Sequence, residues 1–140
     1  MNTKKKSPAK AAHKPELTIL GHTAQPSKKL EAFPNLHPGR DYVVTLETQE
    51  FTCICPITGQ PDFARILIQY TPDKYIVESK SLKLYLWSYR NEGIFHEHLT
   101  NVILNDLVST LDPRWCKVTG EFMARGGIAI TVEAEHKKKK

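Results

Sequence analysis

Several features that would assign a protein class directly are missing from this 140-residue sequence. No apolar run approaches the roughly 18 residues of a membrane-spanning helix, and the basic N-terminus is not followed by the apolar stretch of a secretory signal. No G-x-G-x-x-G follows a strand-like segment, so the Rossmann fingerprint is absent. Only three cysteines are present. An odd number without an export signal favours free thiols in the reducing cytoplasm.

What is present suits one globular domain. Hydrophobic residues make up 40% of the chain and charged residues 25%, an ordinary composition for a domain with its own core. Positive charge is concentrated at the ends, because residues 1–29 hold seven lysines and one acid and residues 137–140 are all lysine. We predict a flexible basic segment over residues 1–29, one folded domain over residues 30–136 that begins with a docked arm, and a solvated lysine tail.

The apolar pattern indicates an α+β fold. Alternating residues predict strands over residues 42–48, 63–70, 75–77, 115–122 and 128–134. Apolar residues at helical spacing predict helices over about residues 79–89 and 96–111. Neighbouring strands with the helices grouped together favour an antiparallel four-stranded sheet with two helices on one face.

The first two predicted strands are joined by the sequence FTCICPITGQPD, residues 51–62. Cys55 precedes a proline, which biases it toward an extended backbone, and Gly59 then helps to turn the chain. Cys55 and Asp62 therefore lie at the two ends of one tight loop. A thiol nucleophile and a carboxylate that moves protons can meet there. The alternative is a buried structural cysteine and a turn-forming aspartate.

The start of the first predicted helix is rich in polar groups. Ser79 has the residue type and position of an N-cap. Lys80 and Lys83 are three residues apart, so both ammonium groups project from one side of the helix. With free N–H groups at the helix end, they could hold a phosphate-bearing ligand. Solvated surface lysines are the alternative, although cations are electrostatically disfavoured at this end of a helix.

His96, Glu97 and His98 begin the second predicted helix. Glu97 could accept two hydrogen bonds from the planar N–H and NH₂ edge of a guanine-like ring, or it could simply cap the first turn. The competing hypothesis is a zinc site with four ligands: Cys53, Cys55, His96 and His98. Neither Cys-x-Cys nor His-x-His is a usual structural-zinc spacing.

Four segments, in this order, resemble the motifs of the 7-cyano-7-deazaguanine reductase family, the nitrile reductases of queuosine biosynthesis, in its short single-module form. They are CPITGQPD at residues 55–62, ESKSLKLY at residues 78–85, FHE at residues 95–97 and RGG at residues 125–127. The resemblance covers about residues 31–135. Four separate motifs in the right order are hard to obtain by chance.

The resemblance implies a fold, an assembly and a reaction. The fold is the tunnelling fold, whose subunits close their sheets into a barrel. Two rings stack, which implies a decamer with active sites between subunits. The reaction is the reduction of a nitrile, 7-cyano-7-deazaguanine, to a primary amine by two NADPH without a metal. Neither a membrane nor direct nucleic-acid binding is expected.

The resemblance also implies roles for single residues. Cys55 is the nucleophile that forms a covalent thioimide, Asp62 is the proton donor, and His96 assists proton movement. Substrate binding is implied for Val77, Glu78, Ser79, His96 and Glu97. Cofactor binding is implied for Ser79, Lys80, Lys83, Arg125 and Gly126.

Two other classes of protein stay open at this point. One is a zinc-dependent pterin or GTP-cyclohydrolase-type enzyme on the same fold, with cysteine and histidine as metal ligands; a metal assay distinguishes it. The other is a small RNA-binding protein that uses its basic ends. The middle of the chain, with 9 basic and 14 acidic residues, is acidic. Its aromatic residues do not cluster with basic ones, which argues against RNA binding.

Overall fold

The computed structural model describes residues 24–139. A short strand, β1 (Ala32–Pro34), precedes two long strands, β2 (Val44–Ile54) and β3 (Pro61–Thr71). The chain continues through β4 (Tyr75–Val77) into two helices, α1 (Ser79–Trp87) and α2 (His96–Leu111). Two further long strands follow, β5 (Trp115–Arg125) and β6 (Ile128–Lys137).

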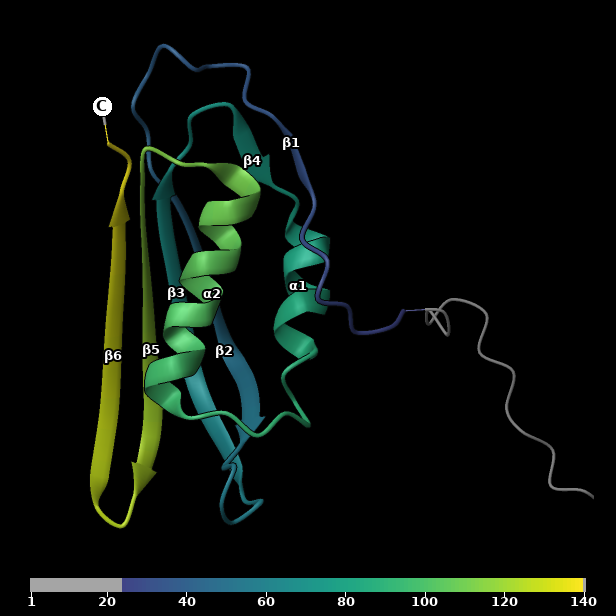
Figure 1. Ribbon diagram of the computed structural model, residues 1–140, viewed down its shortest axis with the longest axis vertical. Helices are drawn as coiled ribbons and strands as arrows, with labels where there is room; N and C mark the ends of the chain where they lie inside the picture. The colour runs from purple at the N-terminus through teal and green to yellow at the C-terminus, as the bar shows by residue number, and fades with distance from the viewer. Residues whose placement is uncertain (1–23, 140) are drawn as a thin grey trace, which may run out of the picture.

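The four long strands form one antiparallel sheet in the order β2-β3-β5-β6, and β1 pairs with β4 in a separate two-stranded sheet. Both helices lie on one face of the large sheet (Figure 1). The predicted α+β class, a four-stranded antiparallel sheet with two helices on one face, is confirmed. No helix in the described part of the chain is long and apolar enough to span a membrane.

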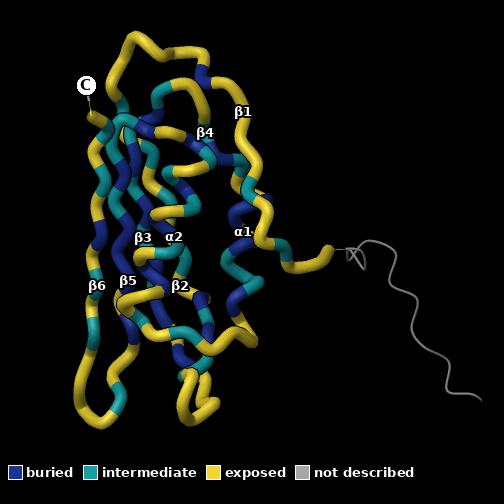
Figure 2. Tube along the Cα trace, in the orientation of Figure 1, coloured by how far each residue is buried: buried dark blue, intermediate teal, exposed yellow. Residues whose placement is uncertain are grey.

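The hydrophobic core lies between the large sheet and the helices. On β3, Ile66, Ile68 and Tyr70 are at most 1% exposed, and the residues between them are partly accessible (Figure 2). α2 contributes a stripe of three leucines and one isoleucine, all fully buried: Leu99, Ile103, Leu107 and Leu111. Each buried aliphatic side chain stabilises the fold by about 1.5–3 kcal/mol. This packing fixes α2 against the sheet.

A β-bulge in β2 changes which side chains face the helices. Leu46 and Thr48 point toward the core before it, whereas Phe51 and Cys53 do so after it. The pairing with β3 shifts between Thr48 and Phe51, so the period of two is broken there. The alternation in the sequence therefore predicts a strand that ends at residue 48, although β2 continues to Ile54.

The sheet face turned away from the helices carries ion pairs. Arg65 on β3 lies 2.6 Å from Glu47 on β2 and 3.1 Å from Glu121 on β5. Lys117 and Glu133 are paired at 3.4 Å on the neighbouring strands β5 and β6. This face is therefore suited to contact with water or with other charged groups rather than to a dry core.

The arm that precedes β2 is docked on the helices. β1 pairs with β4, and the Lys28 ammonium lies 3.1 Å from the centroid of the Tyr89 ring. The ordered arm thus begins by residue 28, inside the segment that the sequence predicts to be flexible. Residues 1–23 of that segment lie outside the described residues.

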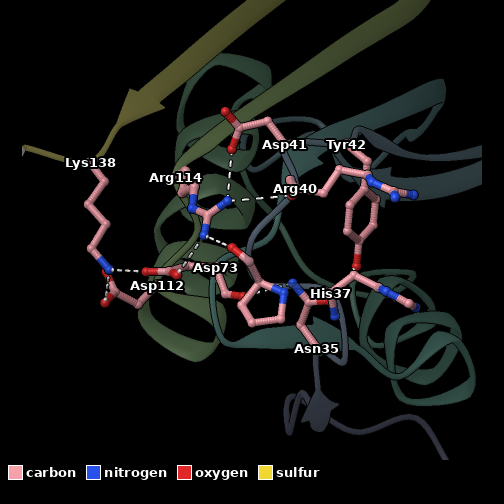
Figure 3. A network of polar contacts seen from close by, with 10 residues as sticks. Asn35, His37, Arg40, Asp41, Tyr42, Asp73, Asp112, Arg114 and Lys138 are labelled. Atoms are coloured by element: carbon pink, nitrogen blue, oxygen red, sulfur yellow. Dashed lines mark hydrogen bonds and ion pairs between the residues drawn. The ribbon is translucent and has the colours of Figure 1, made fainter.

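A polar network ties the two ends of the domain together (Figure 3). Arg114, which follows α2, lies 3.3 Å from Asp73 in the β3–β4 turn. Lys138 is 2.9 Å from Asp73 and 2.7 Å from Asp112, the C-cap of α2. The sequence predicts a lysine tail from residue 137 onward, whereas the ordered contacts of the domain extend through Lys138.

Candidate active site

Cys55 lies in the turn that joins β2 to β3, at the lower end of the sheet in Figure 1. Its N–H donates to the Gln60 carbonyl at 2.9 Å, and its own carbonyl accepts from the Gly59 N–H at 2.9 Å. These two hydrogen bonds fix the Cys55 backbone at the end of β2. The residue is partly exposed, so a ligand can reach the sulfur.

The three cysteines lie in different environments. A hydrogen bond from the Thr58 hydroxyl, with N–H groups of the same turn, lowers the pKa of the Cys55 thiol to about 7, and Arg125 adds to this effect. Burial raises the pKa of Cys53 to about 11 and that of Cys116 to about 12. At pH 7 about half of Cys55 is therefore thiolate, while the other two remain thiols. Cys55 is the reactive cysteine of the three.

Asp62 is a buried residue of β3. It lies opposite Cys53 in the β2–β3 ladder and is 4% exposed. Its Oδ1 accepts a hydrogen bond from Arg125 Nη1 at 2.7 Å, and its Oδ2 lies 3.1 Å from His96 Nε2. A buried carboxylate requires such partners. The interpretation of Asp62 as a simple turn-forming residue is therefore wrong.

His96 reaches Asp62 because the segment before α2 docks on the end of β2. Ile54 forms a parallel bridge with Gly93 in that segment. A Cβ atom at position 93 would lie 3.2 Å from Pro56 Cα, so glycine permits this close approach. The bridge thereby joins the start of α2 to the Cys55 turn.

The His96 ring is further held by an aromatic neighbour. It stacks on Phe122, with the ring centroids 3.8 Å apart and an interplanar angle of 7°. The stacking fixes the plane of the imidazole and directs Nε2 toward Asp62. Glu97 follows in the first turn of α2 and is exposed, so its carboxylate is accessible to a ligand from outside the chain.

Arg125, at the end of β5, completes a cluster of polar side chains with Cys55, Asp62 and His96. The following turn, Gly126 and Gly127, has φ values of 59° and 79°, which glycine adopts without the steric cost of a side chain. The Arg125 guanidinium donates to Gln60 Oε1 as well as to Asp62. The resemblance implies a cofactor role for Arg125, whereas in this chain it pairs with two residues of the β2–β3 hairpin.

Glu78, rather than Ser79, is the N-cap of α1. Its carboxylate accepts hydrogen bonds from the N–H groups of Lys80 at 2.8 Å and Ser81 at 2.6 Å, and these bonds lower its pKa. The prediction of Ser79 as the cap is wrong, and the N–H groups of Lys80 and Ser81 are not free to bind a phosphate. The negative cap also offsets the repulsion between Lys80 and the helix dipole.

A groove of about 700 Å³ lies between β2 and α1. Ser79, Lys83 and Arg90 line it together with apolar side chains that include Leu82 and Trp87. Lys83 is exposed. The groove therefore combines apolar walls with two cations, and on the β2 side with the carboxylates of Glu47 and Glu50. The cysteine turn does not line it.

Within one chain, the site residues at the cysteine end of the sheet (Cys55, Asp62 and His96) lie apart from those at the start of α1 (residues 77–83). The Val77 N–H donates to the Tyr70 hydroxyl at 3.1 Å, near the far end of β3. Asp62 lies near the start of that strand, eight residues away, or about 26 Å of extended chain. Cys55 and His96 belong to the Asp62 end, and the start of α1 lies toward β4 (Figure 1).

The four residues of the zinc hypothesis do not form a metal site. Across residues 24–139, no group of three His, Cys, Asp or Glu side chains is arranged to hold a metal ion. Cys53 is buried as a thiol, His96 binds Asp62, and His98 packs edge-on against Phe95 with centroids 6.2 Å apart.

Sequence reasoning assigned no role to three residues of the cluster. Thr58 and Gln60 lie inside the turn. Because a tight turn keeps its residues close together, the sequence did indicate that their polar side chains could contact the cysteine. Phe122 is an ordinary alternating strand residue in the sequence. Its contact with His96 depends on α2 crossing β5, which no local pattern encodes.

The fold is an α+β unit that carries an accessible cysteine of lowered pKa near a carboxylate and an imidazole, groups of the kind that nucleophilic enzymes use. Comparison with known proteins then gives the family: the model described as QueF-like protein matches residues 61–140. The chain belongs to the QueF-like family.

Individual relatives agree with this assignment. The chain is 73% identical over 122 residues to the NADPH-dependent 7-cyano-7-deazaguanine reductase of Syntrophus aciditrophicus, covering 87% of each protein. It is 60% identical over 116 residues to the protein of the same name from Alkalilimnicola ehrlichii, covering 83% of this chain and 90% of that one. The apo crystal structure of the archaeosine synthase QueF-Like aligns with a TM-score of 0.64 and 26% identity, over 70% of this chain and 96% of the other. The resemblance read from the four motifs is confirmed.

Proposed function

We propose that this protein is an NADPH-dependent 7-cyano-7-deazaguanine reductase of queuosine biosynthesis. It reduces the nitrile to 7-aminomethyl-7-deazaguanine, with two NADPH and two protons consumed per nitrile. The carrying observation is an accessible cysteine of lowered pKa in a turn that Arg125 links to the buried Asp62 and its partner His96, in a chain 73% identical to an enzyme of that name. We expect it to act in the cytoplasm, where its free cysteines stay reduced.

The direct test mixes protein, NADPH and nitrile and follows the nicotinamide absorbance. Two NADPH should be consumed for each amine formed, and the amine should be identified by mass. A chelator should leave the rate unchanged, whereas an enzyme of the zinc-dependent pterin type would lose activity. Absence of nitrile-dependent NADPH oxidation would contradict the proposed function.

The first chemical step is attack of the Cys55 sulfur on the nitrile carbon. The thiol proton passes to the Asp62 carboxylate, the C–S bond forms, and Asp62 returns the proton to the nitrile nitrogen. The product is a thioimide on Cys55, and no proton is gained or lost overall. The lowered pKa of Cys55 makes the sulfur nucleophilic at neutral pH.

Bound NADPH supplies the hydrides of the two later reductions. Between them the C–S bond breaks, Cys55 leaves as a thiolate, and an imine remains. His96, with Nε2 at 3.1 Å from Asp62, moves protons to the nitrogen and shields the imine from water. Asp62 and His96 therefore act as one proton relay.

The deazaguanine ring would be held by both groups of site residues. Glu97 is exposed beside His96 and can accept two hydrogen bonds from the N–H and NH₂ edge of the ring. The Glu78 carboxylate is engaged by its own helix, so Val77, Glu78 and Ser79 would contact the ring from a neighbouring subunit mainly through their backbone.

The groove beside α1 fits an anionic dinucleotide. Its volume of about 700 Å³ lies within the roughly 300–1,000 Å³ of small-molecule and cofactor sites. Lys80 and Lys83 would hold phosphate groups and Ser79 would donate its hydroxyl. The turn at residues 125–127 carries Arg125 and Gly126 and belongs to the cysteine end. It would reach the cofactor only across a subunit boundary.

Lys80→Ala and Lys83→Ala are expected to raise the KM for NADPH by roughly tenfold or more, with a smaller effect on the KM for the nitrile. Each substitution removes a charge-assisted contact to phosphate. Lys74→Ala, an exposed lysine between β3 and β4, is the matched control. Steady-state kinetics with each substrate varied in turn measures the effect. Unchanged constants would make Lys80 and Lys83 ordinary surface residues.

The protein is further proposed to assemble into two stacked rings, a decamer, with sites between subunits. β2 and β6 are edge strands in the described part of the chain, and joining the edges of neighbouring sheets removes them. The charged sheet face would then line a hydrated lumen. Neighbouring subunits would also bring the α1 end of one chain to the Cys55 end of the next.

A mixing experiment tests the shared site. Cys55→Ala and a Lys80→Glu/Lys83→Glu double variant should each be inactive alone. Co-expressed in equal amounts, they should regain about a quarter of wild-type activity, because random assembly pairs an intact cysteine end with an intact lysine end in that fraction of sites. Light scattering should show a ring-sized particle throughout. A fully active monomer, or no rescue in mixed rings, would contradict the shared site.

A further inference from the structure

Asp62 is more deeply buried than the cation that binds it. Its side chain is 3% exposed, while that of Arg125 is 37% exposed, and their atoms are 2.7 Å apart. Burial of a carboxylate charge is costly unless a charged partner compensates it. Arg125 keeps its charge at every accessible pH. The guanidinium therefore compensates the buried charge from the solvent side.

Arg125 also contacts the turn that carries the nucleophile. It donates to the Gln60 side chain, and the Gln60 carbonyl accepts from the Cys55 N–H at 2.9 Å. Arg125 also contributes to the lowered pKa of the Cys55 thiol. One side chain from β5 thus contacts the carboxylate and the turn that carries the nucleophile.

The charged and titratable groups of this cluster come from four elements. They are Cys53 and Cys55 from the end of β2, Asp62 from β3, His96 from α2 and Arg125 from β5. Among these five, Arg125 alone is permanently positive. Its removal would leave the carboxylate with the titratable His96 as its remaining partner in the cluster.

We propose that Arg125 is a positioning residue for formation of the covalent adduct: it orients the Asp62 carboxylate that receives the Cys55 proton, and it holds the Cys55 turn beside that carboxylate. The proposal rests on the proposed function and deepens it, because the resemblance implies only cofactor binding for this arginine.

The proposed role is consistent with the proton balance of the step. The sulfur electron pair forms the C–S bond, and one π pair of the nitrile takes the proton that Asp62 received from Cys55. Arg125 neither gives nor takes a proton. Asp62 therefore ends the step in the same state in which it began.

Alkylation of Cys55 by iodoacetamide tests the role without nitrile or NADPH, so its outcome is independent of whether the proposed function holds. Cys53 and Cys116 are fully buried, and the Cys55→Ala variant gives the blank. Rates are measured against pH for wild type, Arg125→Gln and Arg125→Lys. Lys74→Gln, which removes an exposed charge outside the cluster, is the control.

The wild-type rate should rise with pH around a midpoint of about 7. Arg125→Gln should move the midpoint up toward the roughly 8.5 of a free cysteine and lower the rate at pH 7 by about two- to fivefold. Arg125→Lys should shift it less, because one ammonium cannot make both side-chain contacts. Lys74→Gln should match wild type. Adduct formation with the nitrile alone should slow at least as much as alkylation.

An Arg125→Gln profile that coincides with wild type, together with a raised KM for NADPH, would overturn the proposal and leave Arg125 as a cofactor residue. Circular dichroism checks that each variant is folded. Should Arg125→Gln not fold, Arg125→Lys decides in its place, and an unmoved midpoint in that variant overturns the proposal.

Discussion

Cys55→Ala is expected to lose at least about 10⁴-fold in turnover, the scale seen when a catalytic nucleophile is removed. The variant should still bind the nitrile, because removing a partly exposed sulfur from a hairpin turn leaves the core untouched. Without the sulfur, no other thiol of the cluster can replace it. Cys53 is fully buried with its pKa raised to about 11, so it is neither accessible nor ionised at neutral pH.

Intact-protein mass spectrometry gives the measurement. Wild type mixed with the nitrile in the absence of NADPH should gain the full mass of the substrate, since the thiol adds across the triple bond without a leaving group. Cys55→Ala should gain nothing. Cys116→Ala, which removes a buried thiol of β5, should keep the adduct. An adduct that persists in Cys55→Ala would show that the thioimide forms elsewhere or not at all.

Asp62→Asn is expected to slow turnover by roughly 10²–10⁴-fold, the usual contribution of a general acid–base. The amide preserves the size of the side chain and part of its hydrogen bonding, but it cannot accept and return the Cys55 proton. It also removes the negative charge that pairs with Arg125 at 2.7 Å. Single-turnover rates of adduct formation should fall together with kcat, because the proton transfer belongs to that first step.

Asp73→Asn provides the matched control for this substitution. Asp73 is also bound by two basic side chains, Arg114 at 3.3 Å and Lys138 at 2.9 Å, but in the network of Figure 3 rather than beside Cys55. Its loss should lower thermal stability and leave kcat near the wild-type value. Near-normal kinetics in Asp62→Asn would assign Asp62 to structure alone.

The architecture was largely predictable because its main elements repeat simple periods. Ile66, Ile68 and Tyr70 alternate along β3, and the α2 stripe recurs at helical spacing, so burial of one face dictates both elements. Prediction failed where a local event broke the period. The bulge between Thr48 and Phe51 exchanges the faces of β2, and alternation cannot be followed through it.

The helix cap was missed for a related reason. Serine is a common cap, and Ser79 had the right position, but the backbone turns one residue earlier and the longer Glu78 side chain reaches back to two N–H groups. A difference of one residue here has a functional consequence. It engages the N–H groups of Lys80 and Ser81, so we propose phosphate binding for the lysine side chains rather than for these N–H groups.

The sequence alone determined the class of fold and the family, and it predicted the pair Cys55 and Asp62, because each depends on residues close together in the chain or on a short period. Only the tertiary structure decided that His96 and Arg125 bind the same carboxylate from opposite sides. These contacts join residues 34 and 63 positions away from Asp62. They exist because α2 crosses the sheet and β5 pairs beside β3, and a contact made by packing distant elements leaves no periodic trace in the sequence.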